Sequence, residues 1–351
     1  MRTEYTVLEE YFTQPDQQLD ELIRVLIRTP GLSEYFRKYP NRQADLDNLC
    51  EHTLFEAFTA KQPDAQYWVQ QAMALLYDMH VSPPDKKPVF NQFEPTLMRL
   101  LQQCEIAWLD HEQSRIPALQ FPQKPRAFIH WLEELWSTHE LAAHPLFPYL
   151  EEHASFSEMA DYFLQESTID TRLDDLLALG QVGMTDRVKL EIGENYWSEL
   201  GYGDPTQIHT TLFNALLDAL GVQSQNVPLT LLSESLACGN LLLLTALHRQ
   251  YAYVQHGVLA TMEVMAPERF RRIACGGRRL GLPEPALYYL DLHSTLDVQH
   301  GNGWRDNVLL PTIEANATTR EDIARGVFLR LNTSKDYCDA LYTRYRHGLL
   351  G

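Results

Sequence analysis

The segment from His293 to His300 carries three side chains of the metal-ligand type within eight residues. An α-helix advances about 100° per residue, so Asp297 lies about 40° and His300 about 20° from His293 around the helix axis. The three side chains therefore share one helical face. Two histidines and one carboxylate are the donor set of non-haem iron(II) sites for oxygen chemistry, although manganese and zinc accept similar donors. The alternative is that these side chains face solvent or bond to one another.

Two further segments add carboxylate and imidazole donors. Glu199 ends one predicted helix, His209 lies in the first turns of the next, and the glycines between them allow both side chains to face inward. Asp204 is predicted as the N-cap of the second helix, with Pro205 at its first position. Glu263 lies in an otherwise apolar helical segment, where a buried acid needs a cation or a proton. Either glutamate can instead be a solvated surface residue.

These donors are numerous enough to hold two metal ions. In helical bundles, inward-facing Glu and His side chains from neighbouring helices bind two irons. The other histidines lack an accompanying pattern of carboxylates, and we predict that they are structural. The predicted metal ligands are Glu199, His209, Glu263, His293, Asp297 and His300.

Helical periodicity dominates the sequence around these segments. Between Phe213 and Leu220, for example, apolar residues recur at steps of three and four, while alternating β-branched runs are scarce. We therefore predict an all-α fold. The helices predicted in the C-terminal part cover about 127–142, 156–183, 186–200, 205–220, 228–249, 251–265, 267–279, 284–300 and 320–348.

Proline-rich segments divide the chain into two predicted parts. Residues 81–88 and 116–125 each contain several prolines, which is typical of turns and linkers. A chain of 351 residues is long enough for two separate cores. We place the boundary after residue 125, between an N-terminal helical region (1–125) and a helical domain (126–351) that contains all the predicted ligands.

Composition limits the possible partners. The formal charge is 29 − 47 = −18, which argues against a nucleic-acid-binding protein. The one dense basic cluster, at residues 269–279, is either a solvated helix end or an anchor for a substrate carboxylate. Five scattered cysteines without a C-x-x-C pair fit a reducing compartment. Neither a signal peptide nor a membrane span is recognisable, so we expect a cytoplasmic protein without nucleic-acid or membrane partners.

The order and spacing of the donor segments resemble a known family, the haem-oxygenase-like iron-containing redox enzymes, also called haem-oxygenase-like di-iron oxidases. The resemblance covers about residues 140–345. It implies a helical bundle shaped like haem oxygenase that binds two irons directly through the six ligands, with Glu263 as the bridging carboxylate. The residues that carry the resemblance are Glu199, His209, Glu263 and the motif His293-x3-Asp297-x2-His300-Gly.

The family resemblance also implies a class of reaction. Members use two iron(II) ions to reduce dioxygen. Some then hydroxylate the amine or guanidine nitrogen of an amino acid, and others cleave C–C bonds of fatty or amino acids to give alkenes. The N-terminal region resembles the dimerising extension of the N-oxygenase branch, which favours N-oxygenation of an amino acid or amine in specialised metabolism. A homodimer and an external electron donor are further expectations.

Three alternatives to N-oxygenation remain open from the sequence. The first is oxidative C–C cleavage, for which a long apolar tunnel would indicate a fatty acid and a short pocket with arginine and aspartate an amino acid. The second is a haem- or tetrapyrrole-binding helical protein, although haem needs no carboxylate ligands. The third is a helical protein without catalytic activity.

Overall fold

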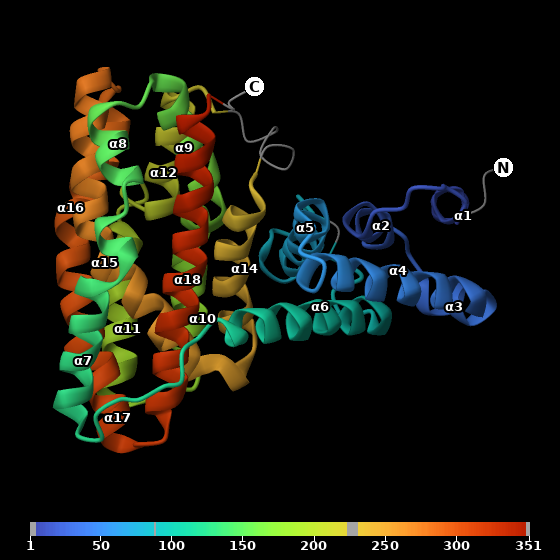
Figure 1. The fold of residues 1–351 in the computed structure, drawn as a ribbon, viewed down its shortest axis with the longest axis horizontal. Coiled ribbons are helices and arrows are strands. Elements are labelled where there is room, and N and C mark those ends of the chain that lie inside the picture. The colour runs from blue at the N-terminus through green and yellow to red at the C-terminus, as the bar shows by residue number, and fades with distance from the viewer. Residues whose placement is uncertain (1–4, 88, 223–230, 349–351) are drawn as a thin grey trace. The chain divides into compact units, whose positions relative to one another are not determined.

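The structure is a computed structural model that describes residues 5–87, 89–222 and 231–348 (Figure 1). No β-strand occurs among these residues, and the predicted all-α class is confirmed. The chain divides into two compact units, Met1–Ser114 and Arg115–Gly351. The boundary that we placed after residue 125 stays a prediction. The predicted helix start at residue 228, like the first four residues, lies outside the described part of the chain.

The first unit is built from α-helices that alternate with short turns. Apolar packing and buried polar contacts hold its helices together. The Tyr77 hydroxyl, for example, donates a hydrogen bond of 2.7 Å to the buried Glu105. Its helices are α1 (Thr6–Phe12), α2 (Leu19–Leu26), α3 (Leu32–Lys38), α4 (Pro40–Phe58), α5 (Pro63–Val81) and α6 (Pro95–Ser114).

The second unit is a bundle in which the longest helices run lengthwise (Figure 1). The helix predicted over 156–183 is two helices, because the chain turns after Asp170. The elements of the bundle are α7 (Pro125–Thr138), η1 (Glu140–Ala143), α8 (Leu146–Glu152), α9 (Phe156–Asp170), α10 (Leu173–Gly180), α11 (Asp186–Glu199), η2 (Gly201–Gly203), α12 (His209–Ala219), α14 (Ser233–Leu247), η4 (Arg249–Tyr251), α15 (Ala252–Leu280), α16 (Glu284–Gly303), η5 (Trp304–Leu309), α17 (Leu310–Ala315) and α18 (Thr319–Arg346).

Helix α15 is the centre of this bundle and packs against α16, α18 and α8. Glycines set the spacing between α15 and α18. A Cβ atom on Gly257 would lie 2.1 Å from the carbonyl oxygen of Ile323, and one on Gly326 would lie 2.0 Å from that of Val254. Two backbones that approach this closely leave no space for a side chain, so these glycines fix α15 against α18.

Two residues that we expected to end helices lie inside them. Gly301 was predicted as the stop of its helix, yet α16 continues to Gly303. A Cβ atom on Gly301 would lie 3.2 Å from the Cα atom of Val264, so the glycine allows α16 to approach α15 closely.

Pro267 was expected to separate two helices, but α15 runs through it. Pro267 cannot donate a hydrogen bond to the carbonyl of Glu263 four residues earlier, and tertiary packing of α15 compensates for this loss.

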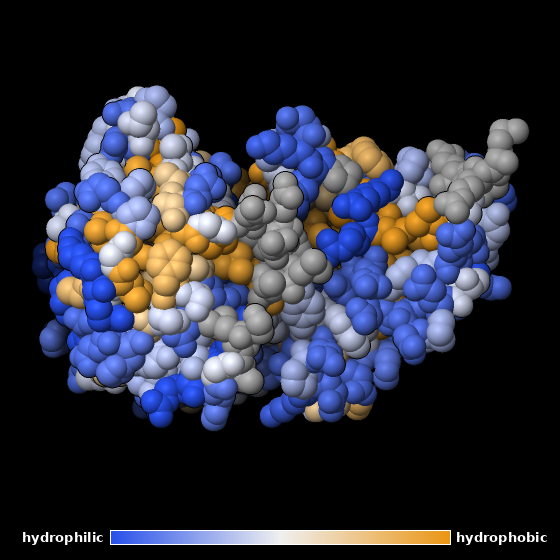
Figure 2. Space-filling view, turned by 90° about the horizontal axis from the view of Figure 1, so that it is seen from above, coloured by the Kyte–Doolittle hydropathy of each residue, from blue (hydrophilic) through white to orange (hydrophobic). Residues whose placement is uncertain are grey.

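The visible face of the molecule is mostly hydrophilic, with smaller hydrophobic areas between the polar ones (Figure 2). In the described part of the chain, each helix is either too short or too polar to cross a membrane.

Candidate metal centre

All the residues predicted as metal ligands lie in one buried cluster inside the second unit. Their exposed fractions range from 2% to 7%. Because charged and polar side chains are costly to bury without partners, their shared burial calls for compensation within the cluster. Four helices supply them: α11 carries Glu199, α12 carries His209, α15 carries Glu263, and α16 carries His293, Asp297 and His300.

A tight turn brings Glu199 and His209 together. Helix α11 ends at Glu199, and Gly201 and Gly203 then adopt φ values of +60° and +90°, a conformation that favours glycine. Helix α12 starts only at His209, so the prediction that Asp204 caps it was wrong. The Asp204 carboxylate instead accepts a hydrogen bond of 2.9 Å from the backbone N–H two residues later and stabilises the turn.

The first group of donors surrounds His209. Its Nδ1 atom lies 2.8 Å from Oε2 of Glu199 and 2.8 Å from Nε2 of His293. The other ring nitrogens face protein partners: Nδ1 of His293 lies 2.8 Å from the carbonyl oxygen of Tyr289, while Nε2 of His209 lies 3.2 Å from the Tyr289 hydroxyl and 3.5 Å from Oδ1 of Asp170. Each imidazole therefore turns one nitrogen toward the interior of the cluster and the other toward a protein partner.

The second group of donors surrounds His300. Its Nδ1 atom lies 3.3 Å from Oε1 of Glu199, 3.5 Å from Oε2 of Glu263 and 3.8 Å from Oδ1 of Asp297. Its Nε2 atom lies 2.6 Å from the hydroxyl of Ser198. Histidines that bind metals usually donate their second ring N–H to a carboxylate, a carbonyl or another polar group, which fixes the tautomer. All three histidines of the cluster show this arrangement.

The cluster fits a metal site. Ligand atoms of Glu199, His209 and His293 lie within 4.8 Å of one another, and so do those of Glu199, Asp297 and His300. Two buried atoms of the cluster also make no hydrogen bond within the described chain: Oε1 of Glu263 and Nδ1 of His300. Buried polar atoms without partners are rare and need an explanation, and a divalent cation between them provides one.

In the absence of a cation, protons have to balance the charge of the cluster. Burial raises the pKa of Asp297 well above its usual range, and repulsion from Glu263 and Glu199 raises it further. Burial lowers the pKa of His209, but Glu199 and Asp170 outweigh this effect and raise it to about 10. Burial likewise raises the pKa of Glu199, yet His209 holds it well below the usual range. Without a metal ion, protonated His209 thus provides the positive charge that balances the buried Glu199 carboxylate.

Metal uptake near neutral pH is therefore expected to release protons. His209 has a pKa of about 10 in the cation-free protein and is protonated at pH 7, whereas a metal-bound imidazole has to be neutral. The apparent metal affinity should rise by about tenfold per pH unit for each proton released, up to about pH 10. Calorimetric titration of iron(II) under anaerobic conditions, in buffers of different ionisation enthalpy, measures the number released. Proton release that stayed at zero between pH 6 and pH 8 would contradict the expected charge state.

One acid of the cluster, Asp170, was missed in the sequence. It is the last residue of α9, only 4% exposed, and it faces His209. A signal was present: Glu166 and Asp170 are four residues apart in a segment with Phe163 and Ile169, so two acids share one face of a largely apolar helix.

The basic cluster at residues 269–279 is divided by the fold. Arg269 points inward and forms an ion pair of 2.8 Å with the buried Glu166. Arg271 pairs with Glu268 at 2.7 Å and is half exposed, as expected for a solvated helix face. Of the two interpretations of this cluster, the solvated helix end thus describes Arg271, while Arg269 lines a cavity inside the bundle.

Comparison with known proteins identifies the family. The sequence profile of a family described as iron-containing redox enzymes matches residues 160–335, which is 176 of the 351 residues. This range includes every residue of the candidate metal centre. A comparison with curated proteins gives no match. The profile match confirms the resemblance that the donor segments suggested, and the chain belongs to the family of iron-containing redox enzymes.

Proposed function

We propose that this protein is a di-iron oxidoreductase that uses dioxygen to N-oxygenate an amino acid or amine. The observation that carries the proposal is the position of Glu199, which belongs to both groups of ligand atoms. One group adds His209 and His293 and the other adds Asp297 and His300, so two ions can bind with Glu199 between them. This geometry favours Glu199 as the bridging carboxylate, whereas Glu263, 3.5 Å from His300, belongs to neither group.

The charge of the cluster supports two ions rather than one. The buried carboxylates around the three histidines are those of Asp170, Glu199, Glu263 and Asp297. Four carboxylates carry four negative charges, and two iron(II) ions carry four positive charges. With a single ion, two protons would have to stay on the cluster, whereas two ions neutralise the four carboxylates without any proton.

The side chains around the donors favour oxygen chemistry by keeping water out. The rings of Phe270 and Tyr289 pack against the imidazole of His293, with centroid distances of 5.4 and 4.3 Å. Bound iron(II) would supply open positions for dioxygen and two of the electrons needed for its reduction. N-oxygenation converts an N–H bond to N–OH while the second oxygen atom leaves as water. This balance consumes two protons and two electrons, so turnover requires an external electron donor.

The shape of the neighbouring cavity favours an amino acid over a fatty acid. The cavity has a volume of about 200 Å³, and Arg269 and Arg330 contribute to its lining. A short pocket with arginines suits a small substrate that carries a carboxylate, whereas a long acyl chain needs an extended apolar tunnel.

The test is a single-turnover reaction with labelled dioxygen. Protein loaded anaerobically with iron(II) is mixed with ¹⁸O₂ and either L-arginine, L-lysine or dodecanoate, and the products are analysed by mass spectrometry. We expect an amino acid to gain one ¹⁸O atom with its carbon count unchanged. Formation of an alkene and carbon dioxide would replace N-oxygenation by C–C cleavage. The di-iron proposal itself would fail if the loaded protein bound fewer than two irons.

A further inference from the structure

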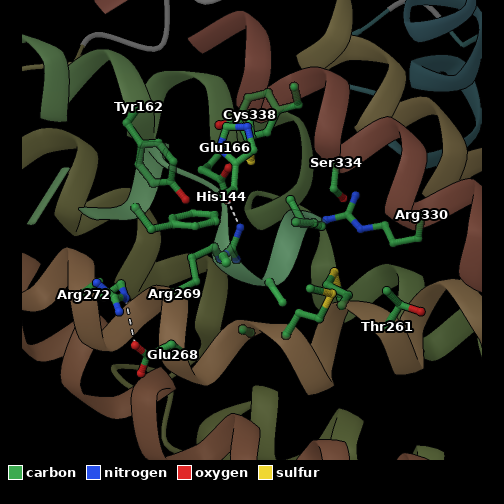
Figure 3. Close-up of a pocket in the computed structure, with 18 of the residues that line it drawn as sticks. His144, Tyr162, Glu166, Thr261, Glu268, Arg269, Arg272, Arg330, Ser334 and Cys338 are labelled. Carbon is green, nitrogen blue, oxygen red and sulfur yellow. Dashed lines mark hydrogen bonds and ion pairs between the residues drawn. The ribbon is translucent and has the colours of Figure 1, made fainter. Parts of the chain in front are cut away.

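A cavity with mainly apolar walls and several charged side chains lies between the η1–α8 segment and helices α9, α15 and α18 (Figure 3). None of the predicted metal ligands lines it. However, its lining residues Ile169 and Met262 are the chain neighbours of Asp170 and Glu263, so the cavity and the metal centre share the walls formed by α9 and α15. Arg269, which also lines the cavity, interacts electrostatically with Asp170 and Asp297, so a ligand beside Arg269 lies near the metal-binding cluster.

Arg330 stands out among the residues of this cavity. It lies on α18, is only 5% exposed, and its guanidinium points toward the middle of the pocket (Figure 3). Its Nη1 atom is buried and makes no hydrogen bond with any described residue. By contrast, the cavity residue Arg269 is paired with Glu166 at 2.8 Å, and Arg272 is paired with Glu151 at 2.9 Å. Arg330 also interacts electrostatically with the buried Glu166. Its buried Nη1 atom nevertheless lacks a hydrogen-bond acceptor, which an anion bound in the cavity would supply.

The charge of the cavity indicates a monoanion. Its lining includes three arginines (Arg269, Arg272, Arg330) and two glutamates (Glu166, Glu268), so the formal balance, leaving histidine aside, is 3 − 2 = +1. A single carboxylate neutralises this charge, whereas a phosphate monoester would leave an excess negative charge in a buried site. The planar guanidinium fork also matches the two oxygens of a carboxylate.

The size of the cavity limits the length of the ligand. A cavity of about 150 Å³ lined by apolar side chains holds benzene, so a volume of about 200 Å³ suits a ligand of roughly ten non-hydrogen atoms. Apolar side chains, among them Phe147, Met262 and Met265, line the rest of the space and suit a short hydrocarbon chain. A long-chain fatty acid exceeds this volume.

We propose that Arg330 binds the carboxylate of a short monocarboxylate, either an amino acid or a simple acid, and directs its other end toward the metal centre. The statement that this ligand is the substrate rests on the proposed function. Carboxylate binding at Arg330 does not, because it depends only on the cavity and on the buried Nη1 atom that has no hydrogen-bond acceptor.

The test measures binding of matched six-carbon probes to the full-length protein, both metal-free and loaded anaerobically with iron(II), by calorimetry. Hexanoate and L-norleucine present the carboxylate, hexanamide replaces it with a neutral group, and dodecanoate is too long. We expect a six-carbon carboxylate to bind at least about tenfold more tightly than hexanamide and dodecanoate. Tighter binding of L-norleucine than of hexanoate identifies an amino-acid site, and the reverse identifies a simple-acid site. Equal binding of hexanoate and hexanamide, or no binding of either carboxylate, overturns the proposal.

Variants of Arg330 connect the binding to this residue. Arg330→Met keeps much of the side-chain volume and removes a buried nitrogen that lacks a hydrogen-bond acceptor, while Arg269 still pairs with Glu166, so the melting temperature should stay about constant. The same variant should lose the preference for carboxylate over amide, while Arg330→Lys, which keeps the charge without the fork, should retain part of it. The matched control is Arg325→Met on the same helix, which removes a surface arginine paired with Glu321 and Asp322.

The stability of the variants separates a ligand-binding role from a structural one. A lower melting temperature of Arg330→Met with unchanged carboxylate binding would show that Arg330 is structural and would overturn the proposal. Iron content measured in the same samples distinguishes failure of the di-iron function from failure of carboxylate binding at Arg330. Carboxylate binding without two bound irons would refute only the di-iron function, and two irons without carboxylate binding would refute only this inference.

Discussion

Replacement of Glu199 by alanine is expected to remove both metal ions, whereas replacement of His209 is expected to remove one. Glu199 provides an oxygen to each group of ligand atoms, and its two oxygens face different histidines: Oε2 lies 2.8 Å from His209 and Oε1 lies 3.3 Å from His300. Without this carboxylate each group loses its shared oxygen donor. The number of irons per chain should therefore fall from about two to near zero in Glu199→Ala.

The measurement is iron content after anaerobic loading and removal of free metal. His209→Ala should retain about one iron per chain, because the donors around His300 come from other residues. The control is Glu194→Ala, which removes an exposed carboxylate from the same helix and should leave iron content unchanged. Circular dichroism confirms that each variant is folded. Two irons retained in Glu199→Ala would contradict the bridging position, and loss of both in His209→Ala would indicate that the two sites fill only together.

The spacing of a metal motif on one helix can be predicted from sequence because helix geometry is local. His293, Asp297 and His300 lie on the predicted face of α16, and the structure places all three in the cluster. The pairing of Glu199 with His209 through the glycines between them was also expected, and Gly201 and Gly203 do adopt positive φ values. Only the predicted cap was wrong, because α12 begins at His209 rather than after Asp204.

Features that depend on packing between distant segments escaped prediction. The spacing of Glu166 and Asp170 indicates a shared helical face but not its partner, and the proximity of Asp170 to His209 results from the packing of α9 against α12. Arg330 is one of many charged residues on α18, and such residues usually face solvent. Its burial follows from tertiary packing, which a single sequence does not display. Pro267 illustrates the same effect for the backbone, because packing of α15 outweighs the helix-breaking tendency of proline.

Asp170→Asn is expected to weaken metal binding in the group around His209 by about 10- to 100-fold, because it removes the charge that orients this histidine. Oδ1 of Asp170 lies 3.5 Å from Nε2 of His209, on the side of the ring that faces away from the cluster. Asparagine keeps the shape and can still accept a hydrogen bond, but a neutral partner makes the imidazole a poorer donor to the metal. Ser198→Ala is the corresponding change behind His300, where the hydroxyl lies 2.6 Å from Nε2.

The two variants should act on different ions, and this difference separates a role in metal binding from a general loss of stability. Competition titrations of cobalt(II) against a chelator, followed by visible absorption, resolve two binding steps. Asp170→Asn should weaken one step and Ser198→Ala the other, while Asp218→Asn, which changes an exposed acid on the same helix as His209, should weaken neither. If Asp170→Asn weakened both steps equally, the acid would act on the whole cluster through its charge. Unchanged affinity in both steps would remove Asp170 from the metal centre, and the balance of four carboxylates against two iron(II) ions would no longer hold.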